Sequence, residues 1–137
     1  MSFLNRIIPL LALSSLLGMA GAPAFADTEF GKQIFIKRNC ALCHRVTRPG
    51  TEFKPICPGL KDVRKRHSKE WMRKWLKDPA AVWKTNDKDV QDINARYFKY
   101  RGSKPKPRES FMATIVGKRF VLTDEEIEAL IEYLWIL

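Results

Sequence analysis

The pentapeptide Cys40-Ala41-Leu42-Cys43-His44 constrains this chain more than any other feature. Its two thiols lie three positions apart, on one turn of a helix, and an imidazole follows directly. Cys-x-x-Cys-His spacing is typical of c-type haem attachment, in which both thiols form thioethers with the porphyrin vinyl groups and the histidine binds iron. A zinc site would need a second ligand pair, and the remaining candidates, Cys57 and His67, lack paired spacing. The motif therefore predicts one covalent haem c at Cys40 and Cys43, with His44 as an iron ligand.

The first 26 residues have the pattern of a secretory signal peptide. Arg6 gives a short positive region, residues 7–17 are mostly apolar, and Ala24-Phe25-Ala26 is a small-x-small cleavage site. The alternative is an uncleaved membrane anchor, but Pro9 and Gly18 interrupt the apolar run. We therefore expect residues 1–26 to be cleaved and residues 27–137 to form a single periplasmic domain.

Helical periodicity dominates the exported part of the sequence. An amphipathic helix is expected over residues 28–39 and a second over residues 68–78, where Pro79 ends it. A capping box at Thr123-Asp124-Glu125-Glu126 predicts the start of a last helix, whose apolar stripe is Ile127, Leu130, Ile131 and Leu134. No stretch of useful length alternates as a strand would, so the fold class expected is all-α.

The chain resembles the class I cytochromes c, small monohaem electron carriers, over most of residues 28–137. Gly31 and Phe35 match a glycine and an aromatic on the first helix of that family, and Leu130 and Tyr133 match a pair on its last helix. In the family these two pairs cross, because the glycine lets the backbones approach closely. The resemblance implies a class I cytochrome c fold with crossing N- and C-terminal helices around one covalent haem.

Two further segments carry the resemblance. Cys57-Pro58-Gly59-Leu60 is similar to the family's Gly-Pro-Asn-Leu, which implies that the Pro58 carbonyl accepts the ring N–H of His44 and that Leu60 packs on the haem. Residues 75–79 resemble the end of the family's middle helix, which implies that Trp75 and Leu76 face the haem pocket.

The second axial iron ligand can come from Met72, Met112 or His67. Met112 is expected in a loop before the last helix and is similar to the family's distal-methionine segment, so we favour it. Met72 stands beside Trp71 on a helix and is expected to fill the core. His67 lies among basic residues and is expected to be solvent-exposed. Ligation of the iron by both His44 and His67 is therefore the second choice.

Two features depart from the family pattern. An inserted segment at about residues 80–107, with a short helix expected from Asp87 to Tyr100, separates Pro79 from Met112. It would cover the haem edge, bind a partner or form a small lid. Cys57 stands where the family has glycine and has no cysteine partner once haem is attached. It is expected either as a buried thiol or as a disulfide that links two chains.

The expected function is one-electron transfer through the haem between periplasmic or membrane redox partners, with no catalytic residues and no enzyme activity of its own. Two alternatives remain. The chain could be the haem subunit of a larger redox complex, or it could bind small ligands or reduce peroxide at an open sixth iron position.

The net charge of +10 is concentrated in two stretches. Eight cations lie between Lys61 and Lys77, against two carboxylates, and five more lie between Lys99 and Arg108 with none. Because export removes nucleic acid as a partner, the expected partner is an acidic redox protein or an anionic membrane-bound complex.

Overall fold

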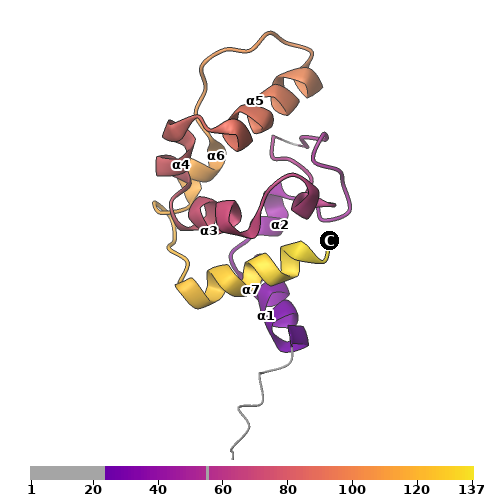
Figure 1. Cartoon of the computed structure of the whole chain (residues 1–137), viewed down its shortest axis with the longest axis vertical. Helices are drawn as coiled ribbons and strands as arrows, with labels where there is room; N and C mark the ends of the chain where they lie inside the picture. Colours follow the sequence, from indigo (N-terminus) through magenta and orange to yellow (C-terminus); the bar gives the residue numbers. More distant parts are fainter. Residues whose placement is uncertain (1–23, 55) are drawn as a thin grey trace, which may run out of the picture.

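The computed structural model describes residues 24–54 and 56–137, so the predicted signal peptide, apart from Ala24–Ala26, lies outside the described residues. The described residues form helices and contain no β-strand beyond isolated bridges, which confirms the all-α fold class. The α-helices are α1 (Ala24–Lys37), α2 (Cys40–Cys43), α3 (Lys69–Lys77), α4 (Pro79–Thr85), α5 (Lys88–Arg101), α6 (Phe111–Ile115) and α7 (Asp124–Trp135), with a 3₁₀ turn η1 (Val63–Lys65) (Figure 1).

Side-chain caps fix where the longer helices begin. The Ser68 hydroxyl accepts the Trp71 N–H at 3.1 Å at the start of α3, and Asp87 accepts two backbone N–H groups at the start of α5. At α7 the Thr123 hydroxyl accepts the Glu126 N–H while the Glu126 carboxylate accepts the Thr123 N–H, both at 3.1 Å. Each bond satisfies a donor that the helix itself leaves unpaired. The helices expected over residues 28–39, 68–78 and 87–100, and the capped last helix, are confirmed.

Pro79 has a second role that the sequence analysis missed. It ends α3 as expected, but it is also the first residue of α4, where proline is favoured because that position needs no backbone N–H. The Asp78 carboxylate caps α4 by accepting the Ala81 N–H at 2.9 Å.

Helices α1 and α7 cross in the lower half of the molecule (Figure 1). A Cβ atom built on Gly31 would overlap the backbone carbonyl of Ala129 and lie 2.8 Å from the Cβ of Tyr133. One turn later the rings of Phe35 and Tyr133 pack with centroids 5.7 Å apart, and Leu130 is buried in the core beside them. The predicted crossing of the terminal helices is therefore confirmed.

The inserted segment is packed into the domain. Phe53, from the long loop after α2, is buried against Tyr97 and Tyr100 of α5, with ring centroids 5.5 and 6.0 Å apart. Helix α4 contacts both α3 and α6. Helix α5 lies above α3 in Figure 1, and its contacts with Phe53 join the inserted segment to the rest of the domain.

We predict that Gly31→Ala lowers the free energy of unfolding by about 3 kcal/mol, because the added methyl group meets the backbone of α7, which cannot move aside as a flexible side chain can. Denaturant unfolding of the haem-loaded protein measures the loss. The control is Gln33→Ala on the exposed side of the same helix, expected to change stability by less than about 0.5 kcal/mol. Equal effects of the two substitutions would contradict the close backbone contact.

Candidate functional site

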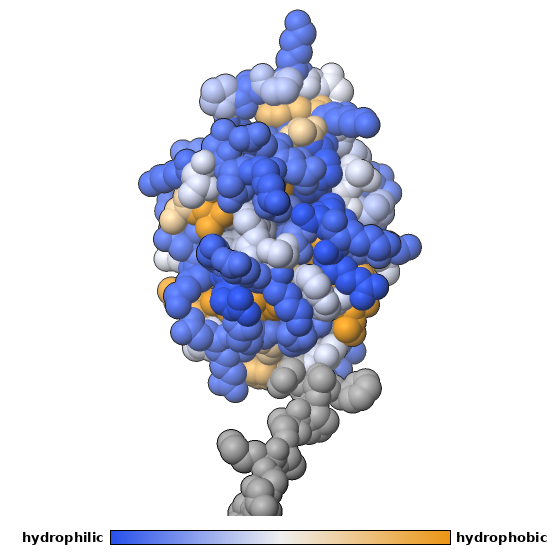
Figure 2. Space-filling view, in the orientation of Figure 1, coloured by the Kyte–Doolittle hydropathy of each residue, from blue (hydrophilic) through white to orange (hydrophobic). Residues whose placement is uncertain are grey.

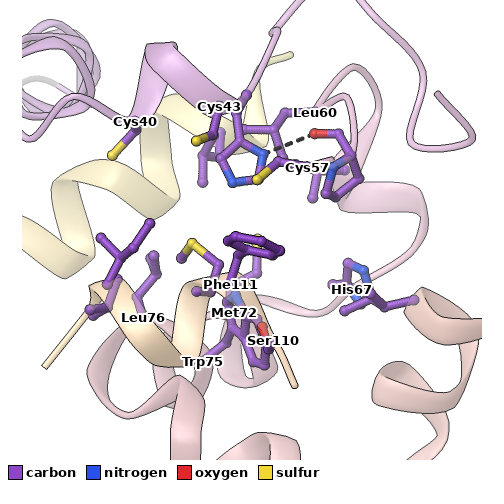
Figure 3. A pocket seen from close by; sticks show the side chains of 18 of the residues that line it. Cys40, Cys43, Cys57, Leu60, His67, Met72, Trp75, Leu76, Ser110 and Phe111 are labelled. Atoms are coloured by element: carbon purple, nitrogen blue, oxygen red, sulfur yellow. Dashed lines mark hydrogen bonds between the residues drawn. The ribbon is translucent and has the colours of Figure 1, made fainter. Parts of the chain in front are cut away.

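The Cys40–His44 motif forms a single helical turn with the imidazole directly after it. Asn39 adopts a left-handed conformation, with φ of 60°, which separates this turn from α1. The His44 backbone N–H donates to the Cys40 carbonyl at 2.9 Å. Both thiols and the imidazole line one cavity (Figure 3).

The ring of His44 is oriented by Pro58. Its Nδ1 lies 2.9 Å from the Pro58 carbonyl oxygen, and because that oxygen can only accept, Nδ1 carries the proton and donates it (Figure 3). Burial lowers the pKa of His44, and the Pro58 carbonyl offsets this only in part. The imidazole is therefore neutral near pH 7, with an unprotonated Nε2 available to bind a metal.

The three thiols lie close together in the same cavity. Burial raises the pKa of Cys40 to about 11, and burial together with the neighbouring Cys43 raises that of Cys57 to about 12. Cys57 is only 6% exposed, which favours its expected role as a buried apolar side chain. The disulfide dimer through Cys57 stays a prediction.

The walls of the cavity bring together every residue proposed for the haem site. Pro58 and Leu60 lie on the side of the cysteines, Trp75 and Leu76 come from α3, and Met112 comes from α6. In Figure 3 the labelled Cys40, Cys43 and Cys57 stand on one side, and Trp75, Leu76 and Phe111 stand on the other.

Met112 lies in the first turn of the short helix α6, so its placement in a loop was wrong. This helix leaves little signal in the sequence, because it has only five residues and its N-cap, Ser110, makes no side-chain capping bond. Met72 is buried in the core, as expected, and also reaches the cavity wall.

His67 was expected on the surface, and this was wrong. It is 6% exposed, its ring stacks on Trp71 with centroids 4.4 Å apart, and its Nδ1 lies 2.7 Å from the Asp89 carboxylate of α5. The basic neighbours in sequence indicated solvent, but the turn after η1 directs the ring inward. Its partner is in the inserted segment, and no local sequence pattern points to it.

Several cavity-lining residues were not identified from the sequence. They include Arg38, Ile93, Arg96 and Phe111, together with Arg66 and Arg108, which had been counted only among the cations of the two basic stretches. Ile93, Arg96 and Arg108 come from the inserted segment or its end, so this segment forms part of the cavity wall.

The cavity suits a haem in its donor set and in its lining. Two thiols on one turn and a neutral imidazole are the groups that c-type attachment and iron ligation require. The side chains around them are mostly apolar or aromatic, as a porphyrin face requires. Arg66 adds a buried Nε–H with no acceptor among the described residues, which an anionic ligand group could satisfy.

Arg38, on the cavity wall, ties the end of α1 to the start of α7. Its guanidinium donates to both carboxylate oxygens of Glu126, at 2.7 and 2.8 Å. Burial raises the pKa of Glu126, but the Thr123 N–H and the Arg38 guanidinium outweigh it and hold the pKa below the usual 4.5. The ionised carboxylate therefore stabilises the folded chain.

We predict that Glu126→Gln lowers the free energy of unfolding by about 2 kcal/mol at pH 7. Because the folded-state pKa is depressed, the wild-type advantage is complete above pH 4.5 and shrinks as the pH falls through the folded-state value. Denaturant unfolding from pH 7 to pH 3 measures both effects. Glu125→Gln, in the same first turn but exposed, is the control, and an advantage of wild type that did not shrink in acid would contradict the ionised pair.

Comparison with known proteins agrees with this geometry. The family model described as Cytochrome c matches residues 28–137, which includes the whole cavity and the inserted segment. No curated protein and no solved structure gave a significant match.

Proposed function

Because the chain belongs to the cytochrome c family, whose members bind a covalent c-type haem with iron, we propose that it is a one-electron carrier without enzyme activity of its own. One observation carries the proposal. Two thiols on one helical turn, and the imidazole that directly follows it, open into a single cavity that is also lined by Met112 of α6.

Each residue of the site has a distinct task in this proposal. Cys40 and Cys43 would hold the haem covalently, and His44 would bind the iron through Nε2, while Pro58 fixes the ring and its tautomer. When bound, the haem supplies the ferrous–ferric couple that carries the electron.

The remaining residues protect and complete the site. Leu60, Trp75 and Leu76 exclude water from the haem faces, so that little solvent has to rearrange on electron transfer. Met112 would be the second iron ligand, and it would keep small ligands away from the iron. Such a closed site would favour an electron carrier over a peroxide-reducing or gas-binding protein.

The proposed location is the periplasm. The support is the signal-peptide pattern of residues 1–26 and the expectation that haem is attached to exported chains. Among the described helices, none has both the length and the apolar character needed to cross a membrane.

We predict that Met112→Ala removes the weak far-red absorption band of sulfur-ligated ferric haem and lets carbon monoxide bind the ferrous protein. Optical spectra of both oxidation states measure these changes, and intact mass verifies that wild type and variant carry the haem on residues 27–137. Met72→Leu, which keeps the core filled, is the control and should retain the band. A wild-type protein that lacks the band, or that binds carbon monoxide readily, would favour bis-histidine ligation or an open site.

The ion pairs in the structure bear on which of the two basic stretches would form a docking surface. Of the eight cations between Lys61 and Lys77, five form ion pairs, three of them with carboxylates of α7. These pairs are Lys69–Glu132, Arg73–Glu128, Lys77–Asp124, Lys74–Glu70 and Lys65–Asp62. Much of this stretch is therefore neutralised at short range.

The second basic stretch, which includes the last turn of α5 and the segment after it, is different. Lys99, Arg101, Lys104 and Lys106 are exposed, and none forms an ion pair with any described residue. The chain then reaches Phe111, which is 51% exposed at the cavity wall. Hydrophilic residues cover most of the face in Figure 2, and small hydrophobic patches interrupt them. We propose that these cations attract an acidic redox partner or an anionic membrane-bound complex to the haem edge near Phe111.

We predict that Lys104→Gln with Lys106→Gln lowers the second-order rate of reduction by an acidic flavodoxin about fivefold at 10 mM salt. The rate difference should nearly vanish at 150 mM salt, where the Debye length falls to about 8 Å. Lys32→Gln with Lys37→Gln removes the same charge from α1, at the other end of the molecule, and should have a smaller effect (Figure 1). Equal losses in the two variants, or a wild-type rate that does not depend on salt, would contradict this docking surface.

A further inference from the structure

Two arginine side chains from different parts of the chain line the cavity beside His67. Arg66 follows η1, and Arg96 lies on α5, in the inserted segment. A Cβ atom built on Gly50 would overlap Cζ of Arg66, and the Gly50 carbonyl accepts a hydrogen bond from Arg96. Both guanidinium groups therefore lie beside Gly50, at one part of the cavity wall.

The hydrogen bonds of Arg66 are incomplete. Its terminal nitrogens donate to the backbone carbonyls of Lys61, Asp62 and Gly59, at 2.9, 3.3 and 3.2 Å. Its Nε–H is buried and has no acceptor in the described part of the chain, and none of the described carboxylates forms an ion pair with it. A partly buried guanidinium with only carbonyl partners and an unsatisfied N–H is suited to an anion.

Arg96 is held in place at the same wall. Its side chain is only 12% exposed, donates to the Asp92 carboxylate at 2.8 Å and donates to the Gly50 carbonyl. The Asp89 carboxylate pairs with His67 rather than with an arginine. The two nearby acids of α5 are thus engaged, and Arg66 keeps its unsatisfied donor.

The attachment chemistry determines which part of a haem would reach these arginines. The vinyl groups and the propionates of a haem lie on opposite edges of the macrocycle. Thioethers at Cys40 and Cys43 fix the vinyl edge, and Figure 3 shows Cys40 and His67 at opposite ends of the cavity. The propionate edge is thereby directed toward His67 and the adjacent arginines.

We propose that Arg66 and Arg96 bind the two propionate carboxylates of the haem. The inserted segment then supplies one of the two anion-binding side chains through α5, in addition to any role in partner docking. This inference rests on the proposed attachment of haem at Cys40 and Cys43. Arginine suits the task because its planar donors match a carboxylate and its charge persists when partly buried.

The test is a titration of the haem carboxylates in the loaded protein. Haem labelled with ¹³C at the propionate carboxylates gives two signals by nuclear magnetic resonance, whose pH dependence is measured in wild type, Arg66→Gln and Arg96→Gln. Each variant should raise the pKa of one propionate by about one to three pH units. Arg96→Lys should restore part of the wild-type value, and Lys88→Gln, exposed on the same helix, should leave both signals unchanged.

The outcomes distinguish a failure of haem attachment from a failure of the arginine assignment alone. If intact mass shows no covalent haem on wild type, the proposed function itself fails. If haem is attached but its propionates titrate alike in wild type and in all three glutamine variants, only the arginine assignment is overturned. If a variant does not fold, the titration of the wild-type protein still tests the proposal. Wild-type propionates that titrate like free carboxylates, near pH 4.3, would overturn it.

Discussion

The contact between α1 and α7 at Gly31 is the constraint on which the rest of the structure depends. Because the two backbones meet there without an intervening side chain, the end of α1 and the start of α2 have fixed positions relative to the last helix. The same approach brings Leu130 and Leu134 of α7 to the cavity wall. Each of these buried side chains contributes roughly 1.5–3 kcal/mol, so the packing that supports the fold also shapes the cofactor cavity.

The features that could be predicted from the sequence are those with a local physical signature. A Cys-x-x-Cys-His turn, a capping box at Thr123 and a helix end at Pro79 each act within a few residues, so their structural consequence is visible in a short window. The need for glycine at position 31 could be recognised only through the family pattern. The backbone that excludes a side chain there belongs to α7, almost a hundred residues away in the sequence.

The errors arose where a distant segment determines the environment of a residue. His67 was expected in solvent because its sequence neighbours are basic, yet Asp89 and Trp71 bury it. The ion pairs of α3 with Glu132, Glu128 and Asp124 of α7 likewise depend on a segment far away in the sequence. In both cases the charges of one segment were visible locally, and their partner lay in a segment whose placement could not be known.

The inserted segment shows how a departure from a family pattern can become part of the site. A detached lid would require few contacts with the remainder of the chain, whereas α5 buries Phe53 against Tyr97 and donates from Arg96 to Gly50. These contacts hold Gly50 and Phe53, in the loop after α2, against α5. A haem bound covalently at one edge gains little further affinity from additional contacts, since it cannot dissociate. If Arg96 binds a propionate as proposed, α5 would supply a charge at the other edge of the haem that acts on the electrostatic potential at the iron.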